Sequence, residues 1–182
     1  SPLLLHSMDI ADCPKFRSFP AGGLAAPCLT SLDLNDCRRL KYLPENMQAL
    51  LPSLRSLTIS SCPQLESFPE RGLPSKLVTL SLSNCDKLII GYKDWGLQSL
   101  CSLKTFVIGQ EKNILHSFPK EGQILPASLT TLSIYGVGLK SLDNLGLHHL
   151  TCLKEFRIDS CRCLRSLPAE GLSSFISNLF IH

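Results

Sequence analysis

A leucine pattern repeats along the whole chain at nearly constant spacing, and this period restricts the possible folds more than any other feature. The template L-x-x-L-x-L-x-x-C fits "LTSLDLNDC" from Leu29, "LRSLTISSC" from Leu54 and "LKEFRIDSC" from Leu153. The steps between successive repeats are 23 to 26 residues, so the 182 residues hold about seven repeats and a truncated eighth. The first apolar position of each repeat falls at Leu5, Leu29, Leu54, Leu77, Leu103, Leu129, Leu153 and Ile176.

Within the template, apolar and polar residues alternate with a period of two, which predicts a short β-strand. Leu32 and Leu34 then point inward, and Asp33 between them points outward. One repeat cannot bury its apolar face alone, so neighbouring repeats must stack in parallel. A period and pattern of this kind are typical of leucine-rich repeats. We therefore predict an α/β solenoid: a leucine-rich-repeat arc with a concave parallel β-sheet and an irregular, short-helical convex side. Residues 1–182 are expected to form a single solenoid and to be a fragment of a longer protein.

Five of the nine cysteines share the last position of the template, namely Cys13, Cys37, Cys62, Cys85 and Cys161. A column of equivalent cysteines defines no pairing, so we predict buried thiols, each a weak donor that meets a backbone carbonyl. The chain also contains no Asn-x-Ser/Thr sequon. Free thiols without a glycosylation site favour a reducing, intracellular and cytoplasmic location.

The segments between strands predict a return path outside the sheet. Apolar pairs follow the cysteine and should turn back into the core: Leu40 with Leu43, Leu65 with Phe68, and Leu164 with Leu167. Prolines then follow at Pro20, Pro44, Pro69, Pro119 and Pro168, and a proline suits a segment that does not join the sheet. Leu97 with Leu100, and Leu147 with Leu150, have the spacing of short helical turns.

Two repeats depart from the template. Glu111 stands at the cysteine position of the repeat from Leu103, and Val137 stands there in the repeat from Leu129. We predict a kink or a change of curvature between Glu111 and Leu142, with Glu111 in contact with solvent.

No motif in the sequence predicts catalysis or metal binding. The segment "GVGLKS" from Gly136 lacks the G-x-x-x-x-G-K-[ST] spacing of a phosphate loop. His148 and His149 are adjacent, so their side chains should diverge, and Cys161 with Cys163 has no second pair to complete a zinc site. The chain is therefore expected not to be an enzyme and to hold no metal or cofactor. A scattered net charge of +3 and no apolar run of about 18 residues argue against nucleic-acid and membrane partners.

The outward positions of the predicted strands are the best candidates for a binding surface, because solenoids use such extended faces for recognition. They are small and hydroxylic in the middle and charged at both ends. Tyr135 is expected to be the one large aromatic on this face, and Tyr135, Arg157 and Lys154 are the strongest single candidates, because aromatic residues and arginine carry much of the energy of protein interfaces. The predicted protein-binding residues are Asp9, Asp33, Asn35, Thr58, Ser81, Val107, Ser133, Tyr135, Lys154, Glu155, Arg157 and Asp159.

Several segments resemble one protein family. The C-x-x-L-x-x-[LF]-P pattern, the G-L-P-x-x-L approach in "RGLPSKL" and the W-G-L-x-x-L turn in "DWGLQSL" are similar to the C-terminal repeats of plant nucleotide-binding leucine-rich-repeat disease resistance proteins of the coiled-coil class. The resemblance implies an intracellular immune receptor whose upstream nucleotide-binding domain, outside this chain, holds ADP or ATP. It also implies that these repeats sense a pathogen effector or a guarded host protein and help to hold that domain inactive.

Two alternatives remain open. Ubiquitin-ligase adaptors also place cysteine at the end of each repeat strand, although they typically continue into a longer helical segment than "RRLKYLP". A generic protein-interaction scaffold would also fit the pattern.

Overall fold

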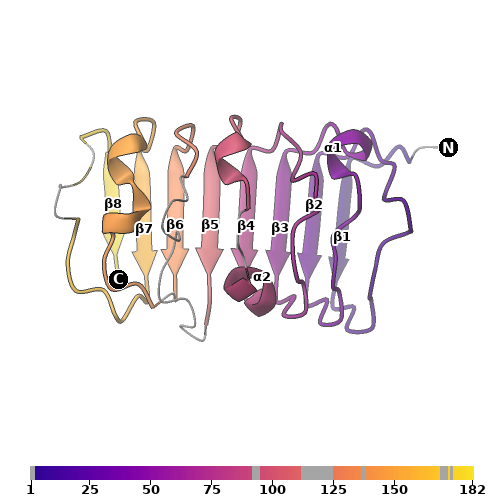
Figure 1. The fold of residues 1–182 in the computed structure, drawn as a ribbon, viewed down its shortest axis with the longest axis horizontal. Helices are drawn as coiled ribbons and strands as arrows, with labels where there is room; N and C mark the ends of the chain where they lie inside the picture. Colours follow the sequence, from indigo (N-terminus) through magenta and orange to yellow (C-terminus); the bar gives the residue numbers. More distant parts are fainter. Residues whose placement is uncertain (1–2, 92–94, 112–124, 137, 169–171, 173) are drawn as a thin grey trace.

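The computed structural model describes residues 3–91, 95–111, 125–136, 138–168, 172 and 174–182. Eight short strands form one parallel sheet in sequence order, and the two termini lie at opposite ends of it (Figure 1). The strands are β1 Ser7–Ala11, β2 Ser31–Asn35, β3 Ser56–Ser60, β4 Thr79–Ser83, β5 Thr105–Gly109, β6 Thr131–Tyr135, β7 Glu155–Asp159 and β8 Asn178–Ile181. This confirms the predicted solenoid.

The register of the sheet follows the sequence template. Leu32 of β2 pairs with Leu57 of β3, which pairs with Leu80 of β4. In β2, β3, β4 and β6 the second and fourth residues are buried and the alternate ones are not. Stacking at a strand spacing of about 4.8 Å therefore joins the inward leucines of successive repeats into one core.

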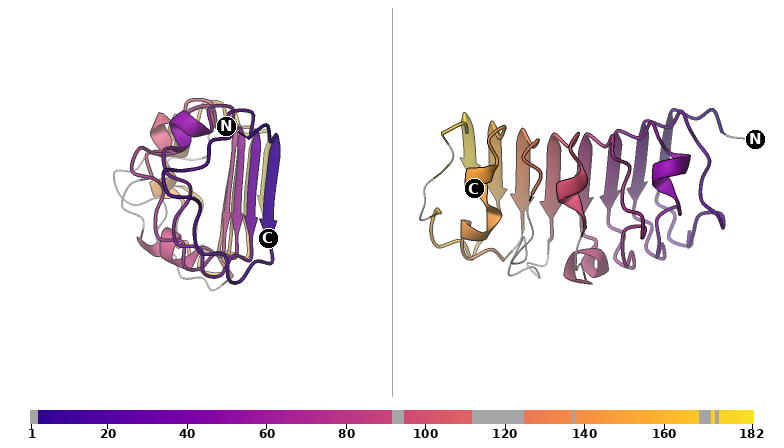
Figure 2. Two further views of the ribbon diagram at one scale, coloured as in Figure 1. Left: turned by 90° about the vertical axis from the view of Figure 1, so that its right-hand side faces the viewer. Right: turned by 45° about the horizontal axis from the view of Figure 1, so that its top comes forward.

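The return segments cover one side of the sheet, and the core lies between the two layers (Figure 2). Helices in this layer are short, as the proline content predicts. Gly96 and Gly146 adopt left-handed conformations and begin equivalent 3-10 turns, which confirms the short helical turns predicted from the spacing of Leu97 with Leu100 and of Leu147 with Leu150. The helical segments are α1 Met47–Leu50, α2 Asp86–Gly91, η1 Leu97–Ser99, η2 Asp143–Leu145 and η3 Leu147–His149.

The cysteine column forms as predicted in the interior of the solenoid. Cys37, Cys62, Cys85 and Cys161 are buried, and all nine cysteines are free. The Cys85 thiol donates to Ser83 O at 3.3 Å and lies 3.7 Å from Ile59 O in the preceding repeat. Burial raises the pKa of Cys62 to about 11 and that of Cys85 to about 12, because the thiolate would lose its hydration.

Two predictions of burial are wrong near the two ends of the described chain. Cys13 occupies the template position in the first repeat, yet it is exposed. Leu167 was expected to turn back into the core, but 47% of its surface is exposed. Both positions have few described neighbours, because the cover for each repeat comes from the repeats beside it.

The repeat from Leu103 departs from the template without interrupting the sheet. β5 pairs with both β4 and β6 in the ordinary register. Glu111 is exposed, as expected, and its backbone N–H donates to Asn84 Oδ1 at 3.0 Å. Gln110 beside it is 1% exposed, and neither polar atom of its side-chain amide has a hydrogen-bond partner in the described part of the chain. Residues 112–124, where the extra residue and Pro119 fall, lie outside the described residues, and the predicted kink stays a prediction.

Candidate functional site: the strand face

The outward side of the sheet, termed the strand face, brings together all but one of the predicted binding residues. Each adjacent pair of strands places equivalent residues side by side, so the face consists of three parallel columns. The central column runs through Asp9, Asp33, Thr58, Ser81, Val107, Ser133 and Arg157, and the next column contains Asn35, Tyr135 and Asp159. Glu155 begins β7 in the first column. Lys154 precedes β7 and lies exposed at the edge of the sheet.

Arg157 is held in place by two neighbours on the strand face. Its Nε donates to Glu155 Oε1 at 2.6 Å. Its guanidinium carbon lies 4.4 Å from the centroid of the Phe180 ring, which is a cation–π distance. The sheet register explains this contact, because Phe180 of β8 is paired with Arg157 of β7. The cluster therefore presents a charged group whose position is already fixed by an anion and a ring.

Phe180 corrects the expectation that Tyr135 is the one large aromatic on this face. The eighth repeat does form a strand, and that strand places Phe180 in the central column next to Arg157. The spacing of the template contained this information: Phe180 lies four residues after Ile176, as Arg157 lies four residues after Leu153.

Tyr135 lies over a neighbouring glycine and is only partly exposed. Gly109 is its register partner in β5, and a β-carbon at Gly109 would overlap the Tyr135 ring. The missing side chain therefore leaves the space that the ring occupies. Gly109 itself is buried. The tyrosine therefore packs against the sheet and keeps only part of its surface open to a partner.

The N-terminal end of the strand face is acidic. Asp9 and Asp33 are register partners in adjacent parallel strands, and like charges at such close positions repel each other. Asp33 accepts a hydrogen bond from Ser31 Oγ at 3.0 Å. The middle of the face is hydroxylic, and Ser83 Oγ donates to Ser60 Oγ at 3.0 Å. The face therefore changes along its length from acidic, through hydroxylic, to an end where aromatic rings lie beside charges of both signs.

The structure also shows a groove that the sequence did not predict. It lies outside the sheet, across the return segments of the first three repeats, and has a volume of about 630 Å³. Phe19, Leu43 and Phe68 give it an apolar wall, and Tyr42 donates to Glu66 Oε2 at 2.9 Å beside it. No contact in the described residues indicates what would occupy it.

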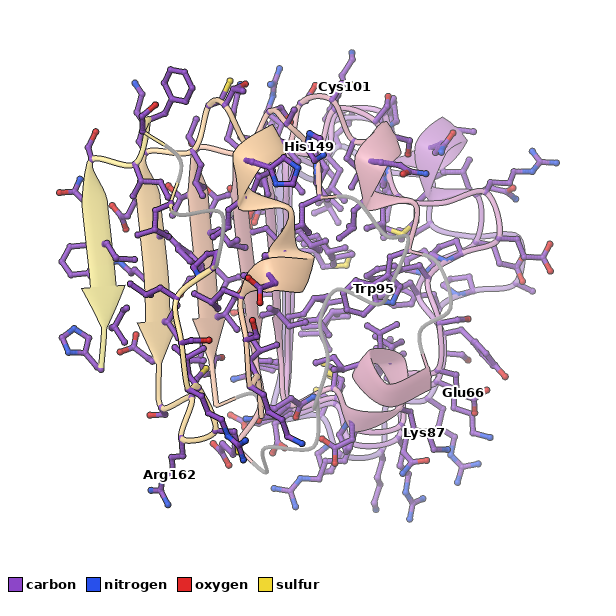
Figure 3. All side chains as sticks on the ribbon, turned by 60° about the vertical axis from the view of Figure 1, so that its left-hand side comes forward. Glu66, Lys87, Trp95, Cys101, His149 and Arg162 are labelled. Atoms are coloured by element: carbon purple, nitrogen blue, oxygen red, sulfur yellow. The ribbon has the colours of Figure 1, made fainter. Side chains whose placement is uncertain are left out.

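His148 and His149 do not diverge as expected. Their ring centroids are 3.9 Å apart and their planes are tilted by 46°. Both lie in η3, at the edge of the sheet where the strands begin, and Figure 3 shows His149 there. Within the described residues, no group of three or more His, Cys, Asp or Glu is placed to hold a metal ion.

Comparison with known proteins gives one informative match. No family profile matches the chain. A protein of Arabidopsis thaliana that is described as a disease resistance protein is 40% identical over 196 aligned positions, which cover 92% of this chain. The chain is a leucine-rich-repeat solenoid homologous to part of a plant disease resistance protein. The solenoid spans 14% of the length of that relative. The resemblance to plant disease resistance proteins is thereby confirmed.

A repeat region of this type normally mediates protein interaction and carries no catalytic site. Among the residues that the structure describes, no helix is both long and apolar enough to cross a membrane.

Proposed function

We propose that this solenoid is the protein-recognition and autoinhibitory module of a plant innate immune receptor. In this proposal the strand face senses a pathogen effector or a guarded host protein. Residues 1–182 form part of a single solenoid, which contacts a nucleotide-binding domain elsewhere in the receptor. The match to a disease resistance protein supports the biological setting, and the nine free cysteines support an intracellular one.

The arrangement of Arg157 is the observation that carries the proposal. Glu155 and Phe180 fix the guanidinium group, and the η nitrogens of Arg157 have no hydrogen-bond acceptor among the described residues. An arginine that is already ordered loses little side-chain entropy when a partner binds. Ordered arginine and aromatic side chains are the residues that dominate most protein interfaces. We therefore place the centre of the interface at β6, β7 and β8, with Phe180 added to the predicted residues.

Sensing requires that the partner distinguishes two states of the receptor. A ligand with equal affinity for the resting and active states shifts no population. To change a resting population of about 99% into an active one of about 99%, the partner must bind the active state about 10⁴-fold more tightly. Intramolecular contacts to the solenoid favour the resting state in this scheme, and the effector or guarded protein favours the other.

The test uses the full-length receptor that contains this solenoid, expressed in leaf tissue. Tyr135→Ala, Arg157→Ala and Phe180→Ala are compared with Tyr42→Ala and Arg165→Ala, which remove one tyrosine and one arginine from exposed positions outside the strand face. The strand-face variants should lose the response to the matching pathogen at unchanged receptor abundance. Binding of the eliciting protein should weaken by at least about 1 kcal/mol per variant.

Autoinhibition is tested by the same receptors without a pathogen. Charge reversal at Asp33 or Arg157 should produce a defence response in uninfected tissue if either residue contributes to the resting contact. A strand face whose variants all keep both the resting state and the pathogen response would refute the proposal.

A further inference from the structure

A group of basic residues lies at the edge where the strands end, in the first two repeats. We call it the basic edge, and it consists of Lys15, Arg17, Arg38, Arg39 and Lys41. All five residues are exposed. Figure 3 shows the same edge of the sheet further along the solenoid, where it carries Lys87 and Arg162.

The fold places these cations side by side. The same tight turn follows the strand in both repeats: Phe16 N donates to Cys13 O at 3.0 Å, and Leu40 N donates to Cys37 O at 3.1 Å. Lys15 and Arg39 therefore occupy one turn position in successive repeats. Neighbouring repeats are separated by about 4.8 Å at the level of the strands.

A second pair follows directly after the turns. The backbone N–H of Lys41 donates to Arg17 O at 3.4 Å, so these two residues are equivalent on adjacent repeats. The basic edge thus contains two pairs of like charges held on neighbouring repeats. Such pairs repel each other.

The nearby carboxylates do not neutralise this group. Asp36 is paired with Arg38, whose Nε lies 2.8 Å from its Oδ1. Glu66 lies on the next repeat after Lys41. Its Oε2 accepts a hydrogen bond from the Tyr42 hydroxyl group, and its Oε1 lies 3.8 Å from Lys87 Nζ. Within the described residues, no ion pair is formed by the other four cations of the basic edge. The five cations of the basic edge and the three carboxylates of Asp12, Asp36 and Glu66 give a net charge of +2.

We propose that the basic edge binds an acidic protein segment. Charge complementarity selects an anion, and two features favour a polypeptide over a nucleic acid or an anionic membrane. Asp12 and Asp36 interrupt the positive surface and would repel a continuous row of phosphates. Phe16 lies between Lys15 and Arg17 in the sequence and packs against the core and edge-to-face on Phe19 at 5.3 Å, but it is only partly buried, so part of its ring stays exposed. An apolar side chain within an acidic segment would find a contact there. This surface is separate from the strand face, so the inference does not depend on the proposed function.

The test measures binding of a fluorescent synthetic peptide to the 182-residue chain by anisotropy. The probe has about ten residues, alternates Glu with Ser and carries one central Leu, a length that spans about 30 Å when extended. The test variant replaces Lys15, Arg17, Arg39 and Lys41 by Gln. The matched control removes the same four charges elsewhere, by replacing Arg55, Lys76, Lys104 and Arg162 with Gln. Circular dichroism confirms that both variants keep the fold.

The test variant should bind the peptide at least about tenfold more weakly than the native chain, with less than a threefold loss in the control, because exposed charges act within a Debye length of about 10 Å. Binding by the native chain should also fall as NaCl rises from about 50 to 300 mM. Equal losses in both variants would overturn the inference, because they would reflect net charge alone. Tighter binding of single-stranded RNA or of phosphatidylserine vesicles than of the peptide would also overturn it. The strand-face variant Arg157→Ala should bind the peptide normally, so either proposal can fail without the other.

Discussion

Cys85 and Cys13 occupy the same position in their repeats, yet Cys85 is fully buried and Cys13 is exposed. The strands β3 and β8 differ in the same way. Alternate residues of β3 are buried, whereas no residue of β8 is buried. The residue types are similar in both regions, and the difference lies in the neighbours. In a solenoid each repeat is covered by the repeats beside it, so burial depends on the position in the stack as well as on the sequence of the repeat.

The largest expected effect comes from truncating a core leucine in the middle of the stack. Leu57 in β3 is 0% exposed, so Leu57→Ala should reduce the free energy of unfolding by about 2–5 kcal/mol. Leu179→Ala is the matched end variant, and because 37% of Leu179 is exposed it should cost less than about 1 kcal/mol. Urea unfolding followed by circular dichroism measures both. Equal losses would show that neighbours do not set burial here.

Glycines extend the comparison from side chains to the backbone. Gly136 has a φ of 62°, and a β-carbon there would overlap the carbonyl oxygen of Gln110 in the preceding repeat. Gly22 in the first repeat has a φ of 84°, and a β-carbon added there would meet no atom of another residue within 4 Å, apart from its two chain neighbours. Gly136→Ala should therefore cost about 3 kcal/mol, and Gly22→Ala only the conformational cost of about 1 kcal/mol. A similar melting temperature for the two variants would contradict the close approach of the two repeats at Gly136.

Alkaline pH should destabilise the solenoid through its buried thiols. Burial raises the pKa of Cys85 to about 12, whereas a thiol in the unfolded chain titrates near 8.5. Between these values the unfolded state has lost a proton that the folded state keeps. The contribution of this thiol to the free energy of unfolding is fully present below a pH of about 8.5. It falls by up to about 1.4 kcal/mol per pH unit as the pH rises toward 12. Urea unfolding at several pH values should show a smaller decline for Cys85→Ala than for Cys13→Ala, and identical declines would refute this account.

Thiol labelling compares the two regions without any substitution, because it measures how fast Cys13 and Cys85 react in the folded chain. Cys13 is exposed, so iodoacetamide at pH 8 should reach it readily. Cys85 should react at least about a thousandfold more slowly, because its raised pKa leaves little thiolate and its neighbours block access. Peptide mass spectrometry after short labelling distinguishes the two sites. Rapid labelling of Cys85 would mean that the stack opens locally.

The strand face shows how far the sequence could lead toward a binding site. The period-two alternation correctly grouped Asp9, Thr58 and Arg157 on one side of the sheet, because strand geometry depends only on local spacing. Contacts between individual side chains could not be predicted in this way. The packing of Tyr135 over Gly109, and the contact between Arg157 and Phe180, require side-chain directions across two strands. Phe180 was not among the predicted binding residues, because the eighth repeat was expected to be truncated.

The sequence by itself determined the repeat, the strand positions, the inward leucines and the cysteine column, because each follows from a regular spacing that one repeat imposes on the next. Only the tertiary structure decided which members of these columns are buried. Cys13 and Leu167 have the residue types of a core position but lack its cover. The tertiary structure also decided which charges share one edge. At the basic edge, Lys15 and Arg39 occupy the same turn position in adjacent repeats although 24 residues separate them in the chain. The physical reason is that local spacing fixes the direction of a side chain, whereas its surroundings come from the neighbouring repeats.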